Sequence, residues 1–194
     1  MRKKTPSALP DTDHVRQELQ RVQRKQRFNR VMRSTIGVIL VAAALSVLVA
    51  TLWMPVLQTY GSSMTPTLQD GEILVSVKSS EFQCGDIIAF YYNNKILIKR
   101  VIAGPTDWVE ITEDGSVYVN GTLLDEPYIQ EKAYGDCDIT FPYQVPDGRY
   151  FVLGDHRSAS SDSRHSTVGC VAAEQIVGKL VFRVWPLSGF GKVG

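Results

Sequence analysis

The feature that most constrains this chain is a run without a single charged side chain, residues 34–69. Its core, residues 36–54, is 19 residues long and almost entirely apolar. A helix of that length spans about 28 Å, close to the roughly 30 Å hydrocarbon core of a bilayer. Trp53 and Tyr60 fall near its outer end, where amphipathic rings prefer the membrane–water interface. The sequence therefore predicts a single transmembrane anchor over residues 34–56.

Charge is distributed unevenly on the two sides of this run. Residues 1–33 carry ten Arg or Lys against three Asp or Glu, a net +7, so the rest of a chain of net charge +1 sums to −6. Basic residues beside a span stay in the cytoplasm, which predicts a cytoplasmic tail over residues 1–33 and an extracytoplasmic domain over residues 57–194. This asymmetry indicates two environments rather than nucleic-acid binding. Val15, Leu19 and Val22 have helical spacing, which leaves open a helix on anionic lipid headgroups or a solvated tail.

Two other interpretations of the apolar run are open. A cleavable signal peptide would have an apolar region of about 7 to 15 residues, shorter than this run. A buried helix of a soluble domain would not need the flanking basic cluster. No later segment predicts a second span, because Lys179 and Arg183 interrupt the apolar residues 176–185.

After residue 70 the sequence changes to short segments rich in Val, Ile, Tyr and Phe, which are typical of strands. Asn93-Asn94 and Asn120-Gly121 separate pairs of such segments as two-residue hairpin turns. The pattern predicts a mainly β fold, a folded antiparallel sheet or barrel, with residues 125–148 as an irregular insertion. The expected strands are Glu72–Val77, Asp86–Tyr92, Ile96–Ala103, Trp108–Thr112, Ser116–Asn120, Thr122–Leu124, Arg149–Leu153 and Ile176–Trp185.

The three cysteines, Cys84, Cys137 and Cys170, are too few for a disulfide scaffold. They have no metal-ligand spacing with histidines, so they do not indicate a metal site. Unpaired thiols are the simpler interpretation, and one disulfide is the alternative for an exported domain.

Lys99 lies in the apolar segment ILIKRVI, residues 96–102. Alternate side chains of a strand share a face, which places Lys99 beside Leu97 and Val101. Aliphatic surroundings lower the pKa of a lysine, and a base that works near neutral pH needs a fall from about 10.4 to about 7 to 8, or roughly 4 kcal/mol. Arg100 cannot take this role because arginine stays charged. The alternative is a lysine at a sheet edge whose amine reaches water.

Two further segments carry groups that could take part in chemistry. Ser63 begins the segment SMTPT, residues 63–67, directly after the apolar run. A serine hydroxyl is a weak nucleophile and needs an adjacent base. The segment GDHRSASSDSR, residues 154–164, follows the strand expected at residues 149–153.

The three segments in this order, with the anchor before them, resemble the bacterial type I signal peptidases, which are membrane-bound serine–lysine proteases. The resemblance covers about residues 34–186 and is to the compact forms with one anchor that are common in Gram-positive bacteria. It implies that Ser63 is the nucleophile and Lys99 the general base. It also implies that Ser160 hydrogen-bonds to the lysine amine and orients it, and that Asp162 and Arg164 form a charged pair that braces the site, with Arg100 as a partner.

The resemblance also implies the remaining parts of the site. The Ser63 N–H is the first candidate for the oxyanion donor, and a side-chain donor is in doubt because Gly61 stands where some members have serine, so Ser62 or another backbone amide would substitute. Leu68 and Ile98 flank the two motifs and are candidate walls of shallow apolar pockets. An extended peptide presents alternate side chains to one side, so the first and third residues before the cut would enter these pockets together.

The substrates implied by the resemblance are exported preproteins with an Ala-x-Ala sequence before the cut. The implied partners are these preproteins, membrane lipid and the secretion translocase, with no nucleic acid and no cofactor.

Three rival functions are open at this point. A Ser-His-Asp hydrolase would use His156 or His165 with Asp155 or Asp162. A soluble self-cleaving Ser/Lys repressor has a similar core but needs a DNA-binding segment. A catalytically inactive, membrane-tethered β domain would act in binding or assembly and would tolerate the loss of the reactive serine and lysine.

Overall fold

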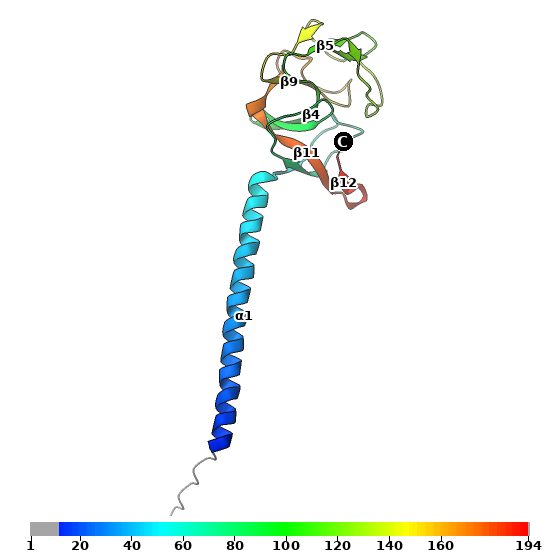
Figure 1. Cartoon of the computed structure of the whole chain (residues 1–194). Coiled ribbons are helices and arrows are strands. Elements are labelled where there is room, and N and C mark those ends of the chain that lie inside the picture. The colour runs from blue at the N-terminus through cyan, green and yellow to red at the C-terminus, as the bar shows by residue number, and fades with distance from the viewer. Residues whose placement is uncertain (1–11, 194) are drawn as a thin grey trace, which may run out of the picture. The chain divides into compact units, whose positions relative to one another are not determined.

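We describe residues 12–193 of the chain in a computed structural model. The chain divides into two compact units, residues 1–49 and 50–194, and each is described by itself. The first holds most of a long helix and the second holds the β-strands (Figure 1).

The helix α1 (Thr12–Trp53) is 42 residues long and combines the basic tail with the apolar run. Among the described residues it is the one helix that is long and apolar enough to cross a membrane. Its side chains are exposed from Arg16 onward, which excludes a buried helix in the core of a domain. The helix ends before Pro55, because a proline disfavours helical geometry in the residue before it.

The strands of the second unit account for most of its regular structure, with two short 3-10 helices, η1 (Ala173–Gln175) and η2 (Leu187–Gly189), near its end. The strands are β1 (Val56–Gln58), β2 (Ile73–Val77), β3 (Ile87–Tyr92), β4 (Lys95–Ala103), β5 (Trp108–Ile111), β6 (Val117–Val119), β7 (Thr122–Leu123), β8 (Tyr143–Gln144), β9 (Arg149–Leu153), β10 (Val171–Ala172), β11 (Ile176–Trp185) and β12 (Gly191–Lys192).

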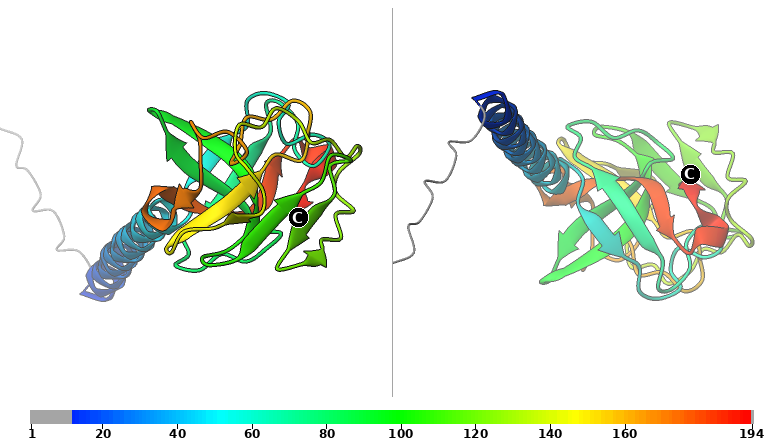
Figure 2. Two further views of the ribbon diagram at one scale, coloured as in Figure 1. Left: turned by 90° about the horizontal axis from the view of Figure 1, so that it is seen from above. Right: turned by 90° about the horizontal axis from the view of Figure 1, so that it is seen from below.

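Two antiparallel sheets make up this unit. The larger has the order β1-β2-β11-β3-β4-β9-β10, with β12 added to β11, and the smaller has the order β7-β6-β5-β8. The strands twist strongly and cross one another in the views from above and below (Figure 2). The expected mainly β fold of antiparallel sheets is thus confirmed.

Each of the eight expected strands is present within one residue at either end. The two hairpin turns are also confirmed, since Asn93, Asn94, Asn120 and Gly121 all have positive φ, as type I′ turns require. Four short strands were not expected: β1, β8, β10 and β12. Each has two or three residues, too few to show an alternating pattern in the sequence.

The core that positions the site lies beneath the loop between β1 and β2. Met64 and Leu68 from this loop pack with Leu74, Ile87 and Leu180 of the larger sheet. A second cluster on β3, β4 and β9 includes Val101, which lies on the same strand as Lys99. The site therefore rests on packed strands rather than on loops alone.

Candidate active site

Ser63 lies on the loop of residues 60–71, and Thr59 closes the base of this loop. The Thr59 N–H donates to the carbonyl of Glu72 at 2.9 Å, and the Gly71 N–H donates to the carbonyl of Thr59 at 3.0 Å. Farther along, Met64 and Leu68 are buried beneath the loop. The loop is thus fixed at both its base and its underside, which holds Ser63 in place.

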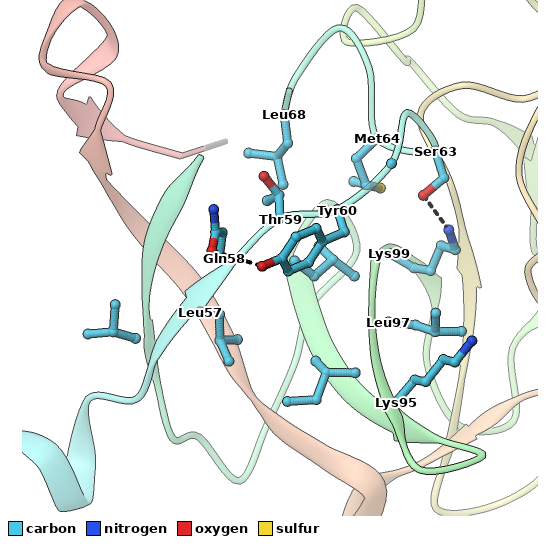
Figure 3. Close-up of a pocket in the computed structure, with 14 residues that line it drawn as sticks. Leu57, Gln58, Thr59, Tyr60, Ser63, Met64, Leu68, Lys95, Leu97 and Lys99 are labelled. Atoms are coloured by element: carbon cyan, nitrogen blue, oxygen red, sulfur yellow. Dashed lines mark hydrogen bonds between the residues drawn. The ribbon is translucent and has the colours of Figure 1, made fainter. Parts of the chain in front are cut away.

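The Ser63 hydroxyl meets the Lys99 amine across the site. Lys99 Nζ and Ser63 Oγ lie 2.7 Å apart in a hydrogen bond (Figure 3). Lys99 extends from the middle of β4, whose register with β3 is regular from Lys95 to Arg100. The structure therefore brings together the two residues that the sequence singled out as nucleophile and base, 36 positions apart.

The surroundings of Lys99 favour the neutral amine. The residue is only 3% exposed. Burial is the main cause that lowers the pKa of Lys99 from its ordinary value to about 8, since a desolvated ammonium is disfavoured. The Asp162 carboxylate opposes this shift, and the Arg164 cation adds to it. A lysine with this pKa has a substantial neutral fraction in mildly alkaline solution and can accept a proton.

The third motif, residues 154–164, begins where β9 ends and passes directly beneath the loop that carries Ser63. The His156 N–H donates to the Ser63 carbonyl at 3.1 Å. A Cβ on Gly154 would lie 2.5 Å from that carbonyl oxygen and 2.2 Å from Ser160 Oγ. Only glycine permits this approach, so the position of Ser63 depends on Gly154.

Asp162 and Arg164 form the buried charged pair that the resemblance implied. Arg164 Nε donates to Asp162 Oδ1 and its Nη2 to Oδ2, both at 2.8 Å, and the Gly154 N–H donates to Oδ2 at 3.0 Å. Burial alone would raise the pKa of Asp162, but the hydrogen bonds and charge of Arg164 outweigh it and hold this pKa below its usual range. The carboxylate therefore stays ionised and ties the third motif to the end of β9.

Arg164 also fastens the irregular insertion to the site. Its Nη1 donates to the carbonyl of Tyr134 at 2.7 Å, and its Nη2 donates to the carbonyl of Arg157 at 2.8 Å. Gly135 lies against the guanidinium, where a Cβ would approach Nη1 to 2.3 Å. The insertion of residues 125–148 is thus tied to the segment that lies beneath Ser63.

The expected hydrogen bond from Ser160 to Lys99 is not formed. The Ser160 hydroxyl is buried and has no hydrogen-bond partner of acceptable geometry among the described residues. It is nevertheless close enough to Asp162 to contribute to the lowered pKa of that carboxylate. The amine of Lys99 is directed to Ser63 instead, and no hydrogen bond joins it to Ser160.

The expected pairing of Arg100 with Asp162 and Arg164 is wrong. Arg100 donates from Nε to Asp155 Oδ1 at 2.9 Å and from Nη2 to Asp155 Oδ2 at 2.7 Å. The reason is the alternation along β4, which turns Arg100 to the face opposite Lys99. Asp155, which the sequence raised only for a histidine mechanism, therefore serves as the partner of Arg100.

Other contacts around this ion pair were not found from the sequence. Thr67 Oγ1 donates to Asp155, and the ring of Tyr128 lies 3.8 Å from the Arg100 guanidinium carbon. Glu126 forms a buried ion pair with Arg157. An acidic residue in an irregular insertion gives no sequence signal for a partner more than 30 positions away.

A cleft of about 570 Å³ begins at Ser63 and Lys99 and extends between β1 and the first half of β4. Leu68 and Ile98, the candidate pocket walls, both line it. The remaining lining residues are Val56, Leu57, Gln58, Thr59, Tyr60, Gly61, Met64, Lys95, Ile96 and Leu97. Most of this surface is apolar, as expected for a cleft that accepts small apolar side chains.

Both long sides of the cleft are strand edges without a partner strand. β1 is the end strand of its sheet and pairs only with β2. β4 pairs with β9 only from Arg100 onward, so residues 95–99 have β3 on one side and the cleft on the other. An unpaired edge offers backbone donors and acceptors to an extended peptide.

The expected oxyanion donors lie at the Ser63 end of the cleft. The side chain of Ser62 is exposed, and its carbonyl accepts from the Thr65 N–H at 3.1 Å. Gly61 has φ +86°, a conformation that suits glycine, and its N–H donates to Asp70 Oδ1 at 2.7 Å. The N–H of Gly61 is therefore already engaged, which leaves the Ser63 N–H and the Ser62 hydroxyl as the candidates.

Within the described part of the chain, neither His156 nor His165 forms a triad with Ser63. His156 Nδ1 lies 3.1 Å from Thr65 Oγ1 and 3.3 Å from the Ser62 carbonyl, and His165 lies 3.6 Å from Asp136. The three cysteines are free thiols. Within residues 12–193 no group of His, Cys, Asp or Glu side chains is arranged to hold a metal ion.

Comparison with known families and proteins points to one family. Residues 32–185 match the family model for signal peptidase, peptidase S26. Signal peptidase IB of Staphylococcus aureus (strain COL) is 41% identical over 151 residues, which cover 67% of this chain and 77% of that protein. Signal peptidase I of Bacillus caldolyticus is 41% identical over 162 residues, which cover 73% of this chain and 87% of that protein.

Among solved structures, a signal peptidase I from Enterococcus faecalis V583 matches 52% of this chain and 97% of its own, with 34% sequence identity and a TM-score of 0.44.

A mainly β unit with a serine–lysine contact, preceded by an apolar helix, thus belongs to a protein of the S26 class of peptidases. The chain is a member of the bacterial type I signal peptidase family, and it is a serine endopeptidase that removes signal peptides. The rival function of a repressor is set aside by this membership, and the names of the relatives, all peptidases, speak against an inactive assembly protein.

Proposed function

We propose that Ser63 and Lys99 form the catalytic pair with which this peptidase cuts preproteins. Neutral Lys99 accepts the Ser63 proton, and Ser63 Oγ attacks the carbonyl carbon of the scissile bond. The C–N bond then breaks, the leaving amine takes the proton from Lys99, and the signal peptide stays as an ester on Ser63. Lys99 next accepts a proton from water, whose oxygen attacks the ester carbon; the bond from that carbon to Ser63 Oγ breaks, Lys99 returns the proton to Oγ, and the signal peptide leaves as a free carboxylate. The observation that carries this proposal is the 2.7 Å contact between a serine and a buried lysine of lowered pKa.

The supporting residues act through position rather than by touching the substrate. Asp162 and Arg164 hold the third motif under the Ser63 loop, and Arg100 with Asp155 fastens β4 to the same motif. The buried hydroxyl of Ser160 has no hydrogen-bond partner among the described residues. It is therefore available to donate a hydrogen bond to the neutral amine of Lys99, or to accept one from the ammonium after Lys99 has taken the Ser63 proton. We propose this as its orienting role.

The substrate is proposed to bind as an extended strand between β1 and residues 95–99 of β4. The two unpaired edges support this arrangement, because a peptide placed there pairs its backbone on both sides. The first residue before the cut enters the apolar pocket with Ile98 and Leu68, and the third residue lies beside Ile96 on the same side of the strand. These walls are apolar, and small residues fit them, which agrees with an Ala-x-Ala preference.

The carbonyl oxygen that becomes negatively charged needs donors at the Ser63 end of the cleft. We propose the Ser63 N–H as the first donor and Ser62 as the second, since the Gly61 N–H is bound to Asp70. The hydroxyl of Ser62 is exposed and has room to turn toward the substrate.

We propose that α1 anchors the enzyme in the cell membrane, with residues 1–33 in the cytoplasm, residues 34–56 in the bilayer and residues 57–194 outside. The length and apolar composition of the helix and the basic residues before it support this orientation. Ser63 follows the end of the helix by ten positions, so the active site is close in sequence to the membrane in which a signal peptide resides. Partners on this account are preproteins, membrane lipid and the translocase.

The test is cleavage of a purified secretory precursor in neutral detergent by the full chain and by Ser63→Ala and Lys99→Ala. Both variants should lose at least about 1,000-fold in kcat/KM, since the nucleophile or its base is missing. A Lys192→Ala variant, altered at an exposed lysine on β12, is the matched control and should keep full activity. Near-normal cleavage by either site variant would sink the serine–lysine mechanism.

A further inference from the structure

The far end of the cleft carries a charge that the proposed mechanism does not use. Lys95 begins β4 and is exposed, whereas Lys99 is buried at the catalytic end. Among the described residues that line the cleft, these two carry the only charged side chains. Figure 3 shows Lys95, Leu97 and Lys99 projecting from the same side of the strand.

The rise of the strand sets the separation of the two lysines along β4. Four residues at about 3.3 Å each separate the backbone positions of Lys95 and Lys99 by about 13 Å. A peptide whose cut bond lies at Ser63 and whose earlier residues fill the cleft runs in the same direction as β4 and advances by the same rise per residue. Position along β4 can therefore be converted into position along the substrate.

The proposed pocket at Ile98 fixes which substrate residue lies opposite which residue of β4. With the first residue before the cut opposite Ile98, the second lies opposite Leu97, the third opposite Ile96 and the fourth opposite Lys95. Opposed residues of paired strands turn their side chains to the same face. The side chain of the fourth residue therefore points to the ammonium of Lys95.

The ammonium of Lys95 has no competing partner. It pairs with no Asp or Glu among residues 12–193. It is also free of the nearby turn, since Asn93 and Asn94 are uncharged. The charge is thus open to whatever peptide occupies the cleft.

On the basis of the proposed binding mode, we propose that Lys95 is a specificity-determining residue that favours preproteins with Asp or Glu at the fourth position before the cut and disfavours Lys or Arg there. The contact is an exposed ion pair, for which a gain of up to about five-fold in kcat/KM is the expected size. Such a contact weakens with salt, because the screening length falls to about 3 Å at 1 M.

The experiment compares two Ala-x-Ala precursor peptides that differ only by Asp or Lys at the fourth position before the cut. The full chain in neutral detergent should cleave the Asp peptide about five-fold faster in kcat/KM. Lys95→Gln should bring this ratio to about one, and Lys95→Glu should reverse it. At about 1 M salt the wild-type preference should largely disappear.

Lys192→Glu changes the net charge equally, away from the cleft, and should leave the wild-type preference intact. A preference that Lys95→Glu does not alter, or that Lys192→Glu alters as much, would overturn the proposal. An effect of the Lys95 variants on cleavage that appears only in liposomes with anionic lipid would also overturn the proposal, because it would assign Lys95 to lipid headgroups. Equal cleavage of both peptides by an active wild type refutes only this inference, whereas activity that survives Ser63→Ala refutes the proposed mechanism itself.

Discussion

At the scale of single residues, the burial of Lys99 suits its proposed role as a base but lowers the stability of the folded protein. The lowered pKa suits a base, but an ammonium with 3% exposure costs free energy in the folded state. The folded pKa is about 8 and the unfolded value is the ordinary 10.5, so the unfolded chain binds more protons between these values. Wild-type stability should therefore rise with pH from about 8 to about 10.5.

Replacing Lys99 by methionine should stabilise the fold while it abolishes activity. The buried ammonium costs about 3 kcal/mol, and the lost hydrogen bond to Ser63 returns about 1 kcal/mol, so the expected gain is about 2 kcal/mol at pH 7. Denaturant unfolding of both proteins in the same detergent measures it. The gain should nearly vanish at pH 10, where the wild-type amine is neutral in the folded state.

Lys192→Met is the control for this measurement, because Lys192 is exposed and its replacement should change stability by less than about 0.5 kcal/mol at either pH. A Lys99→Met protein that is less stable than wild type at pH 7 would show that the buried ammonium of Lys99 does not destabilise the fold.

At the scale of elements, the site is assembled where the loop after β1, the middle of β4 and the turn after β9 meet. β4 and β9 were both predicted from segments rich in Val, Ile, Tyr and Phe, and so were the position of Lys99 on the first and of residues 154–164 after the second. β1 was not, because its three residues continue the uncharged run and carry no separate pattern. The pairing of Arg100 with Asp155 was missed because it depends on which strand lies beside β4, which one sequence does not specify.

Gly154→Ala should test how closely the turn after β9 supports the nucleophile. The added Cβ would lie 2.5 Å from the Ser63 carbonyl oxygen and 2.2 Å from Ser160 Oγ, so one of the two segments has to move. A displacement of about 1 Å costs on the order of 100-fold in rate, and we expect a fall of at least that size in kcat/KM. A full kinetic comparison with the wild type measures it.

Gly104→Ala is the matched control, because its Cβ would meet nothing closer than Asp107 Oδ2 at 3.6 Å. It should keep activity within about two-fold, as a surface change does. If Gly154→Ala were as active as Gly104→Ala, the close approach beneath Ser63 would have no part in positioning it.

At the scale of the whole molecule, we propose that an anchor and a catalytic unit divide the chain between two environments. The apolar helix and the β domain were both predictable, because they depend on length, charge and local pattern. The paths of residues 125–148 were not, since they follow from contacts such as those of Arg164 with the Tyr134 carbonyl. Such contacts join irregular segments and leave no periodicity in the sequence.

The proposed orientation predicts how thiols react in protoplasts of an expressing bacterium. Cys84 is exposed in the β unit and should react with a membrane-impermeant maleimide in intact protoplasts. A cysteine at position 20 of α1, introduced as Gln20→Cys in a Cys84→Ser, Cys137→Ser background, should react only after lysis. Labelling of the position 20 thiol in intact protoplasts would contradict a cytoplasmic tail.

The Lys99→Arg variant decides whether Lys99 acts as a base. Arginine keeps a cation and its hydrogen bonds at this position but cannot give up its proton. The account predicts that kcat/KM for a precursor falls at least about 1,000-fold across pH 6 to 10, while the wild-type value rises with pH and levels off above about 8. A Lys99→Arg enzyme that cleaves within ten-fold of wild type would contradict the claim.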